Sequence, residues 1–231
     1  TLLKNPAEVS ISISKTAEKI EQQAYCTYDS QKMPLLINLL SDPKHVSILI
    51  FSSTKINVKN IGRELARLKY QASAIHSDLE QPEREEVLRN FRNRSLRILV
   101  ATDVLSRGID IENISLVINF DVPGDAEDYV HRVGRTARAE STGMAVTFIN
   151  ENDMRRFGRI EDLIGYPVKK MPMPETLNIG EGPKYDPKAG SDHKWGGKKS
   201  FSKSGPSKGG KKPFHHKKGG SKPTSNKPPS A

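Results

Sequence analysis

The chain has 231 residues and a formal net charge of +10, which fits one domain of ordinary size with a surplus of basic side chains. Its single cysteine, Cys26, excludes an internal disulfide and any metal site built from several cysteines. Because one free thiol fits a reducing compartment, we expect a cytoplasmic protein. No apolar run approaches the ~18 residues needed to span a bilayer, so we expect no membrane partner.

The positive charge is concentrated at the C-terminal end. Residues 183–231 hold thirteen lysines and two acids, a net charge of +11, whereas residues 1–182 hold 24 basic and 25 acidic side chains. The C-terminal stretch is rich in Gly, Ser and Pro and nearly lacks aliphatic side chains, so it cannot bury enough apolar surface to offset the entropy of ordering. We therefore predict a folded domain over residues 1–182 and a disordered basic tail over residues 183–231.

Strands and helices are expected to alternate along the domain. Short apolar runs such as VSILIF (46–51) are typical of strands buried on both faces, and segments such as 55–68, with Thr54 as an expected cap, carry apolar side chains at helical spacing. This alternation favours an α/β fold, a parallel sheet with helices on both faces. The predicted strands are 20–28, 46–51, 72–75, 97–101, 116–120 and 143–149, and the predicted helices are 30–40, 55–68, one with Pro82 in its first turn that runs to 91, 126–139 and 152–164.

Three polar segments each include or follow a predicted strand. In parallel α/β sheets, ligand-binding loops lie beyond the carboxyl ends of the strands. We therefore expect these loops to meet at one edge of the sheet. The segments are ILIFSSTK (48–55), HSDLEQPEREEVLRNF (76–91) and ATDVLSRGID (101–110).

A fourth segment, YVHRVGRTARA (129–139), carries three arginines at regular spacing. Arg132, Arg135 and Arg138 lie three residues apart, so on the helix predicted over 126–139 they share one face. Each guanidinium is always charged, and its planar fork matches phosphate oxygens. On spacing alone, a solvated basic face explains the three arginines equally well.

Taken together, the four segments resemble motifs of the DEAD-box RNA helicases. In that family the fifth motif reads roughly ATDxxxRGID and the sixth HRxGRxxR, which residues 101–110 and 131–138 match. Residues 48–55 resemble the fourth motif, and 76–91 resemble the segment after it, with its Gln-x-x-Arg. The motifs keep the family's order and spacing over residues 1–168, and their combination is most similar to the bacterial RhlE-type branch.

The sequence departs from the family pattern at two positions. Ala137 and Ser77 stand where many members have glycine. Both side chains are small, so we expect altered detail and not lost chemistry.

The resemblance also indicates what this chain lacks. ATP hydrolysis in the family needs a GxxxxGK[ST] phosphate loop and an acidic DEAD motif that holds Mg²⁺, and neither occurs in the sequence. We therefore expect the second of two RecA-like domains, followed by the basic tail, and we expect the chain alone to be inactive. Its partner would be the N-terminal RecA-like domain of the same protein, which would hold most of the ATP and the Mg²⁺.

The resemblance assigns two catalytic pairs in the sixth motif. Arg135 and Arg138 match the arginine fingers, which reach across a cleft to ATP on the partner domain. His131 and Arg132 match residues that contact the partner's catalytic motifs and link RNA binding to hydrolysis. Two alternatives stay open: a buried, hydrogen-bonded structural role for His131, and pairing of the two fingers with acids nearby, namely Asp125, Glu127 and Asp128.

Further matches concern ATP and RNA. Gly108 and Asp110 match positions near ATP, with Asp110 at the ribose, although an N-cap role for Asp110 is the local alternative. The RNA-backbone contacts would fix the position of the strand without reading its sequence. Arg84 has an alternative, which is pairing with Glu80 or Glu85 along its own helix. The residues matched to RNA contacts are Ser52, Ser77, Arg84, Thr102 and Gly108.

The function implied is that of an ATP-dependent RNA helicase, which couples ATP binding and hydrolysis to local duplex unwinding or to remodelling of RNA–protein complexes. One alternative is a non-catalytic RNA-binding or regulatory module that kept the fold. Another is a DNA-directed helicase of superfamily 2, whose sixth motif commonly begins with glutamine where this chain has His131. The tail, with lysines and sparse aromatic residues, is predicted to bind RNA without sequence preference, unless it is only a solubility extension.

Overall fold

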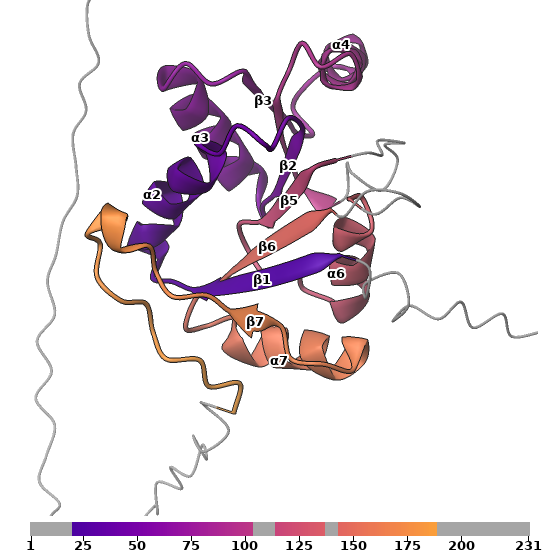
Figure 1. Cartoon of the computed structure of the whole chain (residues 1–231). Coiled ribbons are helices and arrows are strands. Elements are labelled where there is room, and N and C mark those ends of the chain that lie inside the picture. Colours follow the sequence, from indigo (N-terminus) through magenta and orange to yellow (C-terminus); the bar gives the residue numbers. More distant parts are fainter. Residues whose placement is uncertain (1–19, 104–113, 137–142, 189–231) are drawn as a thin grey trace, which may run out of the picture. The chain divides into compact units, whose positions relative to one another are not determined.

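The computed structural model describes residues 20–103, 114–136 and 143–188 (Figure 1). Over these residues the chain forms a seven-stranded sheet in the order β3-β4-β2-β5-β6-β1-β7, and each strand runs parallel to its neighbours. The predicted α/β fold with a parallel sheet is confirmed. The strands are β1 (Glu21–Cys26), β2 (Ile48–Phe51), β3 (Ala72–Ile75), β4 (Ile98–Ala101), β5 (Leu116–Asn119), β6 (Met144–Ile149) and β7 (Lys169–Lys170), and the helices are α2 (Asp29–Leu40), α3 (Lys55–Arg67), α4 (Gln81–Arg92), α6 (Ala126–Val133), α7 (Met154–Ile164) and the 3₁₀ turn η1 (Glu175–Leu177).

Helices cover both faces of the sheet. Leu49 and Phe51 of β2 belong to a core shared with α6 and α7, whereas Ile48 and Ile50 belong to a core shared with α2 and α3. Figure 1 shows the two pairs of helices on opposite sides of the strands. Burial on both faces explains why β2 reads as an unbroken apolar run. None of the helices in this described part is both long and apolar enough to cross a bilayer.

Four neighbouring strands end in register. Ala101 of β4 pairs with Ile75 of β3 on one side and with Phe51 of β2 on the other. Phe51 in turn pairs with Asn119 of β5. Because neighbouring strands lie ~4.8 Å apart, the residues that follow these four strands form one row along the carboxyl edge. The loops after residues 51, 75 and 101 therefore begin side by side, as the sequence predicts.

Helix starts follow their local signals. Thr54 accepts the N–H of Asn57 at 3.1 Å through its hydroxyl, so it caps α3 as predicted. Pro82 lies in the first turn of α4, where its fixed φ suits the helix and its missing N–H leaves no bond unmade. These caps place the N-termini of α3 and α4 at the carboxyl edge, directly after the loops that follow β2 and β3.

Helix α6 is shorter than predicted. It ends at Val133, and Gly134 is its C-cap, with its N–H bonded to the carbonyl of Val130 at 2.8 Å. The N–H of Arg135 then bonds the carbonyl of Arg132 at 3.2 Å, which is a tighter turn and not a continued α-helix. The prediction of a helix over 126–139 is therefore wrong over residues 134–136, where the α-helical bonding gives way to a tighter turn, and residues 137–139 lie outside the described residues.

The chain remains packed past the boundary predicted at residue 182. The Tyr185 hydroxyl donates a 2.6 Å hydrogen bond to Glu161 of α7, and its ring meets Phe157 edge-on at 6.2 Å. Pro187 lies so close to α7 that a Cβ added to Gly158 would come within 2.7 Å of its side chain. Residues 183–188 thus form part of the domain surface, whereas the rest of the predicted tail, 189–231, lies outside the described residues.

Candidate functional site

The row of strand ends brings together most of the polar residues singled out in the sequence. His76 and Ser77 follow β3, Thr102 follows β4, and Ser52 follows β2. Since β3, β4 and β2 are consecutive in the sheet, these groups stand side by side at its carboxyl edge. Asp103 and Asp121, which follow β4 and β5, complete the row.

Arg132 is the buried centre of this edge. Its Nε and Nη2 donate to the two carboxylate oxygens of Asp103 at 2.5 and 2.7 Å. Its Nη1 donates to the side chain of Asn119 at 3.2 Å and to the carbonyl of Asp121 at 2.9 Å, and its guanidinium lies 5.0 Å from the centre of the Phe51 ring. With 2% of Arg132 exposed, its charge is committed within the domain. This burial does not fit the predicted contact with a partner domain, and it makes Arg132 a brace between α6 and three strands.

The helical phase of α6 explains this placement. Tyr129, Val130 and Val133 pack into the core, and Arg132 falls on the same face of the helix. His131 points the other way and is exposed. The alternative of a buried structural His131 is therefore wrong, and its contact with a partner domain stays a prediction.

Arg135 lies in a different environment from Arg132. It is half-buried in the turn that follows α6. The next residue fixes this turn: the buried Thr136 donates its hydroxyl to the carbonyl of Ile114 at 2.6 Å. Gly143 packs so closely on Thr136 that an added Cβ would overlap its hydroxyl oxygen. Arg132 and Arg135 therefore do not form one helical face, and Arg138 lies outside the described residues.

Asp121 joins the loop after β2 to helix α2. Its Oδ2 accepts the Ser52 hydroxyl at 2.6 Å and the Ser53 N–H at 3.0 Å. Its Oδ1 accepts the Lys32 ammonium at 3.0 Å. Burial alone would raise the pKa of Asp121, but these three donors outweigh it and hold the pKa below its usual value. Burial alone would lower the pKa of Lys32, yet Asp121 and Asp29 hold it above its usual value.

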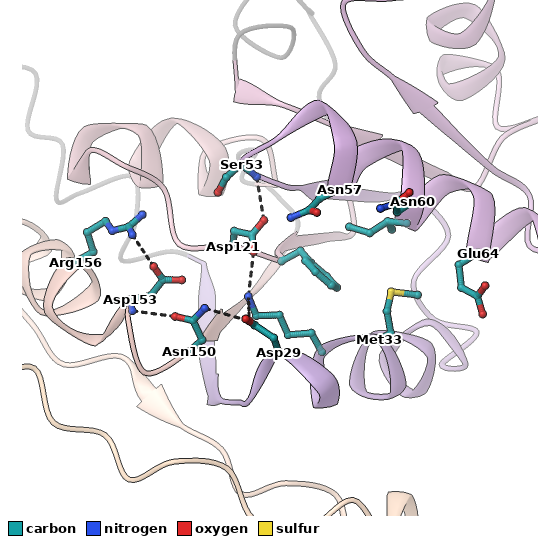
Figure 2. A pocket seen from close by; sticks show the side chains of 13 residues that line it. Asp29, Met33, Ser53, Asn57, Asn60, Glu64, Asp121, Asn150, Asp153 and Arg156 are labelled. Atoms are coloured by element: carbon teal, nitrogen blue, oxygen red, sulfur yellow. Dashed lines mark hydrogen bonds and ion pairs between the residues drawn. The ribbon is translucent and has the colours of Figure 1, made fainter. Parts of the chain in front are cut away.

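These bonds line one side of a pocket of about 740 Å³ (Figure 2). Lys32 also binds Asp29 at 3.0 Å, and Asp29 accepts the side-chain N–H of Asn150 at 3.1 Å. At the N-terminus of α7, Arg156 pairs with Asp153 at 2.9 Å, and both side chains line the same pocket. Burial raises the pKa of Asp153. The pKa of Asp121 is lowered instead, because hydrogen-bond donors surround its carboxylate. Figure 2 shows Asn57, Asn60 and Glu64 of α3 on the opposite wall.

The residues after β3 are arranged by α3 and α4. Arg84 donates from Nη2 to the carbonyl of Ser77 at 2.9 Å, so this bond braces the loop after β3 and does not go to Glu80 or Glu85. Asp78 bonds Lys59 at 2.6 Å and Lys55 at 2.9 Å. Those two lysines hold the pKa of the exposed Asp78 below its usual value.

Several predicted site residues lie outside the described part of the chain. Within that part, no group of three or more His, Cys, Asp or Glu side chains is arranged to hold a metal ion. The predicted site residues outside the described ranges are Gly108, Asp110 and Arg138.

Sequence reasoning missed three residues that organise the edge. Asp103 and Asp121 each follow a predicted strand at the ligand-binding edge, and that shared position was a usable signal. Lys32 gave no comparable signal, because it lies 89 residues from Asp121 in the sequence. The three residues all act by holding loops, not by facing solvent.

Comparison with known proteins agrees with this architecture. A family model of the helicase conserved C-terminal domain matches residues 31–140. The solved C-terminal domain of the DEAD-box protein Dbp5 is 30% identical, with a TM-score of 0.61 over 66% of this chain and 89% of that chain. The chain belongs to the DEAD-box family. It is a C-terminal, RecA-like helicase domain.

Other DEAD-box relatives show how much of such proteins this domain represents. The ATP-dependent RNA helicase RhlB of Pseudomonas putida is 41% identical over 75% of this chain and 44% of the relative. A DEAD-box protein from the hyperthermophile Methanococcus jannaschii is 37% identical, with a TM-score of 0.63 over 67% of this chain and 42% of that chain. The DEAD-box chain thus spans less than half the length of the curated relatives it matches. Membership of the RhlE-type branch stays a prediction.

Proposed function

We propose that this domain is the C-terminal half of an ATP-dependent RNA helicase. In such an enzyme, ATP binding and hydrolysis would drive local unwinding of an RNA duplex or remodelling of an RNA–protein complex. The domain would close over ATP and RNA together with an N-terminal RecA-like domain. The relatives named as ATP-dependent RNA helicases support RNA over DNA as the substrate.

The row of strand ends supports an RNA-backbone site. Ser77 and Thr102 lie at the ends of adjacent strands, and the loop at Ser52 follows on the next strand. Arg84, braced on the Ser77 carbonyl, adds a positive charge to the same edge. Contacts of this kind hold phosphates and sugars without reading bases, which suits an enzyme that acts on many duplexes. Gly108 would add a main-chain contact.

Arg135 supports the ATP side of the proposal. Phosphoryl transfer spreads charge over the γ-phosphate oxygens, and a preorganised guanidinium that stabilises this charge contributes about 10³ to 10⁵ in rate. The fixed turn at Thr136 holds the backbone of Arg135 in place for that task. Arg138, Gly108 and Asp110 would contribute further ATP contacts, and His131 would face the partner domain. Mg²⁺, which would neutralise phosphate charge, would be held mainly by that partner domain.

One observation carries the proposal, and it is the position of Arg132 between the two sites. Its side chain holds Asp103, the neighbour of Thr102 on the RNA side. Its carbonyl accepts the N–H of Arg135 on the ATP side. A shift of the Thr102 loop on RNA binding would therefore move the turn that carries Arg135. In this proposal Arg132 links RNA binding to hydrolysis from inside the domain.

The tail and the location complete the proposal. Residues 183–231 carry a net charge of +11, which would release counterions from RNA and add affinity without sequence preference. We place the protein in the cytoplasm, where its free cysteine would stay reduced.

The proposal is tested by comparing the chain alone with the chain joined to an N-terminal domain that carries a phosphate loop and a DEAD motif. We expect no ATP hydrolysis from the 231 residues alone and RNA-stimulated hydrolysis from the two-domain protein. RNA-stimulated hydrolysis by the chain alone, at a level unaffected by Arg135→Ala, would contradict the two-domain mechanism. A two-domain protein that binds RNA but never hydrolyses ATP would favour a non-catalytic RNA-binding module.

A further inference from the structure

The loop after β2 offers RNA a different hydroxyl from the one that the family resemblance selects. Ser52 is fully buried, and its hydroxyl donates a 2.6 Å hydrogen bond to Oδ2 of Asp121. A serine hydroxyl has one proton to donate, and phosphate oxygens are acceptors. Ser52 therefore has no proton left for RNA. The neighbouring Ser53 is exposed and borders the pocket next to Asn57 (Figure 2).

Asp121 fixes the backbone that presents Ser53. Its Oδ2 accepts the Ser53 N–H at 3.0 Å as well as the Ser52 hydroxyl. Its main-chain carbonyl accepts a 2.9 Å bond from Arg132. One residue thus holds the loop after β2 and is itself held by the buried brace of α6.

Lys32 makes this arrangement compatible with a phosphate. An unpaired carboxylate at Asp121 would repel an RNA phosphate bound at Ser53, since like charges a few ångströms apart near a protein surface repel strongly. The Lys32 ammonium lies 3.0 Å from Oδ1 of Asp121 and offsets the charge of this carboxylate. Only 3% of Lys32 is exposed, and Asp29 holds the ammonium from its other side at 3.0 Å. The ion pair is therefore a fixed part of the edge and not a mobile surface contact.

We propose that Ser53 makes the RNA-backbone contact after β2, and that Asp121 and Lys32 are its positioning residues. Ser52 acts through Asp121 and does not touch RNA. This inference rests on the proposed function, because it assumes that RNA crosses the carboxyl edge of β3, β4 and β2.

The test is hydrogen exchange of the full 231-residue chain, titrated with a single-stranded oligouridine and read by peptide. Reading by peptide separates the edge from RNA bound by the tail. RNA should slow exchange over residues 76–84 and 52–57 of the unaltered chain. In Ser53→Ala, half-maximal protection of 52–57 should need about tenfold more RNA, the loss of one hydrogen bond to a charged group.

Two further variants test the positioning residues. Lys32→Met and Asp121→Asn should weaken protection of 52–57 at least as much as Ser53→Ala, while protection of 76–84 is kept. Ser52→Ala should add nothing to Asp121→Asn, since both act through the same carboxylate. Arg156→Met is the matched control, because it breaks an ion pair in the same pocket that has no bond to Ser52 or Ser53.

The outcomes separate the two proposals. In one outcome, RNA protects residues 76–84, and the protection of residues 52–57 is the same in Ser53→Ala and Lys32→Met as in the unaltered chain. That outcome would overturn this inference and leave the proposed function standing. Loss of protection in Ser52→Ala but not in Ser53→Ala would assign the contact to Ser52 and overturn it as well. Absence of RNA protection at both segments of the unaltered chain would overturn the proposed RNA site, and the inference with it.

Discussion

Arg132 and Arg135 lie three residues apart in the sequence, but the domain places them in contrasting environments. Arg132 is within α6, buried, and bonded to Asp103, Asn119 and the carbonyl of Asp121. Arg135 lies beyond the end of that helix, half-buried in a turn. The first guanidinium holds the fold together, whereas the second is the one that we propose meets ATP on a partner domain.

The same division recurs along the carboxyl edge. Lys32 is buried and Asp121 is half-buried, and both hold elements together. Ser53 is exposed on the loop after β2, and Arg84 is half-buried in the first turns of α4. Residues of the first kind should affect stability first, and those of the second kind should affect ligand binding first.

The largest loss of stability is expected for Arg132→Met. Removing this guanidinium leaves the Asp103 carboxylate without its bidentate partner, and breaking a buried ion pair typically costs about 3–5 kcal/mol. Urea denaturation followed by circular dichroism should show this loss. Arg135→Met is the control and should cost less than about 1 kcal/mol. Equal losses of stability in the two variants would contradict a structural role for Arg132 that Arg135 does not share.

Substitution of Tyr185, which packs on α7 outside the proposed site, should change stability without changing RNA binding. Tyr185 packs on Phe157 and donates to Glu161, so Tyr185→Ala should lower the free energy of unfolding by about 1–3 kcal/mol. Tyr185→Phe should lose only the hydrogen bond, about 0.5–1.5 kcal/mol. Thermal denaturation measures both variants. RNA affinity that fell in parallel with stability would show that this region is not separate from the site.

The two carboxylates of the pocket should respond to pH in opposite directions. The pKa of Asp121 is held below the ordinary 3.8, so its stabilising contribution is present above that value and is lost as the pH falls through the folded-state pKa. The pKa of Asp153 is raised above 3.8, so its contribution is present below that value and is lost as the pH rises through the folded-state pKa.

Denaturation of Asp121→Asn and Asp153→Asn between pH 3 and pH 7 checks these signs. Relative to the unaltered chain, Asp121→Asn should be least stable near neutral pH, whereas Asp153→Asn should gain there. Slopes of the same sign would mean that the donors around Asp121 do not outweigh its burial.

The smallest effect on stability is expected for Arg84→Ala. Its guanidinium donates to the carbonyl of the exposed Ser77, so the loss should stay below about 1 kcal/mol. RNA affinity should fall about tenfold, the cost of one charged hydrogen bond. In a two-domain protein the ATPase rate should fall mainly at limiting RNA. A fall at saturating RNA would instead place Arg84 in the chemical step.

The sheet and most helices could be predicted from local patterns. The strand 72–75 has the predicted bounds, and α3 begins after its predicted cap, Thr54, since alternation, apolar spacing and capping are all local signals. Helix α6 was predicted too long, because the arginine spacing continues past Val133 while the α-helical bonding does not. The burial of Arg132 was also within reach, because it falls on the helix face of Tyr129 and Val133.

The pairings that organise the site could not be predicted from the sequence. Lys32 and Asp121 are 89 residues apart, and only the folded sheet brings α2 next to the end of β5. The packing of residues 183–188 was missed for a different reason. Their composition is that of the tail, but a single aromatic ring, Tyr185, finds a place on α7.

The central claim, that this domain presents Arg135 to ATP held by a partner domain, is tested most directly by Arg135→Lys in the two-domain protein. Lysine keeps the charge but loses the fork that can hold two oxygens at once, so the substitution separates geometry from charge. The measurement is steady-state ATPase activity at saturating RNA. We expect turnover to fall by about 10³ or more, with RNA binding in the absence of nucleotide and the melting temperature nearly unchanged. Turnover close to that of the unaltered protein would contradict the claim and make Arg135 a structural or RNA-binding residue.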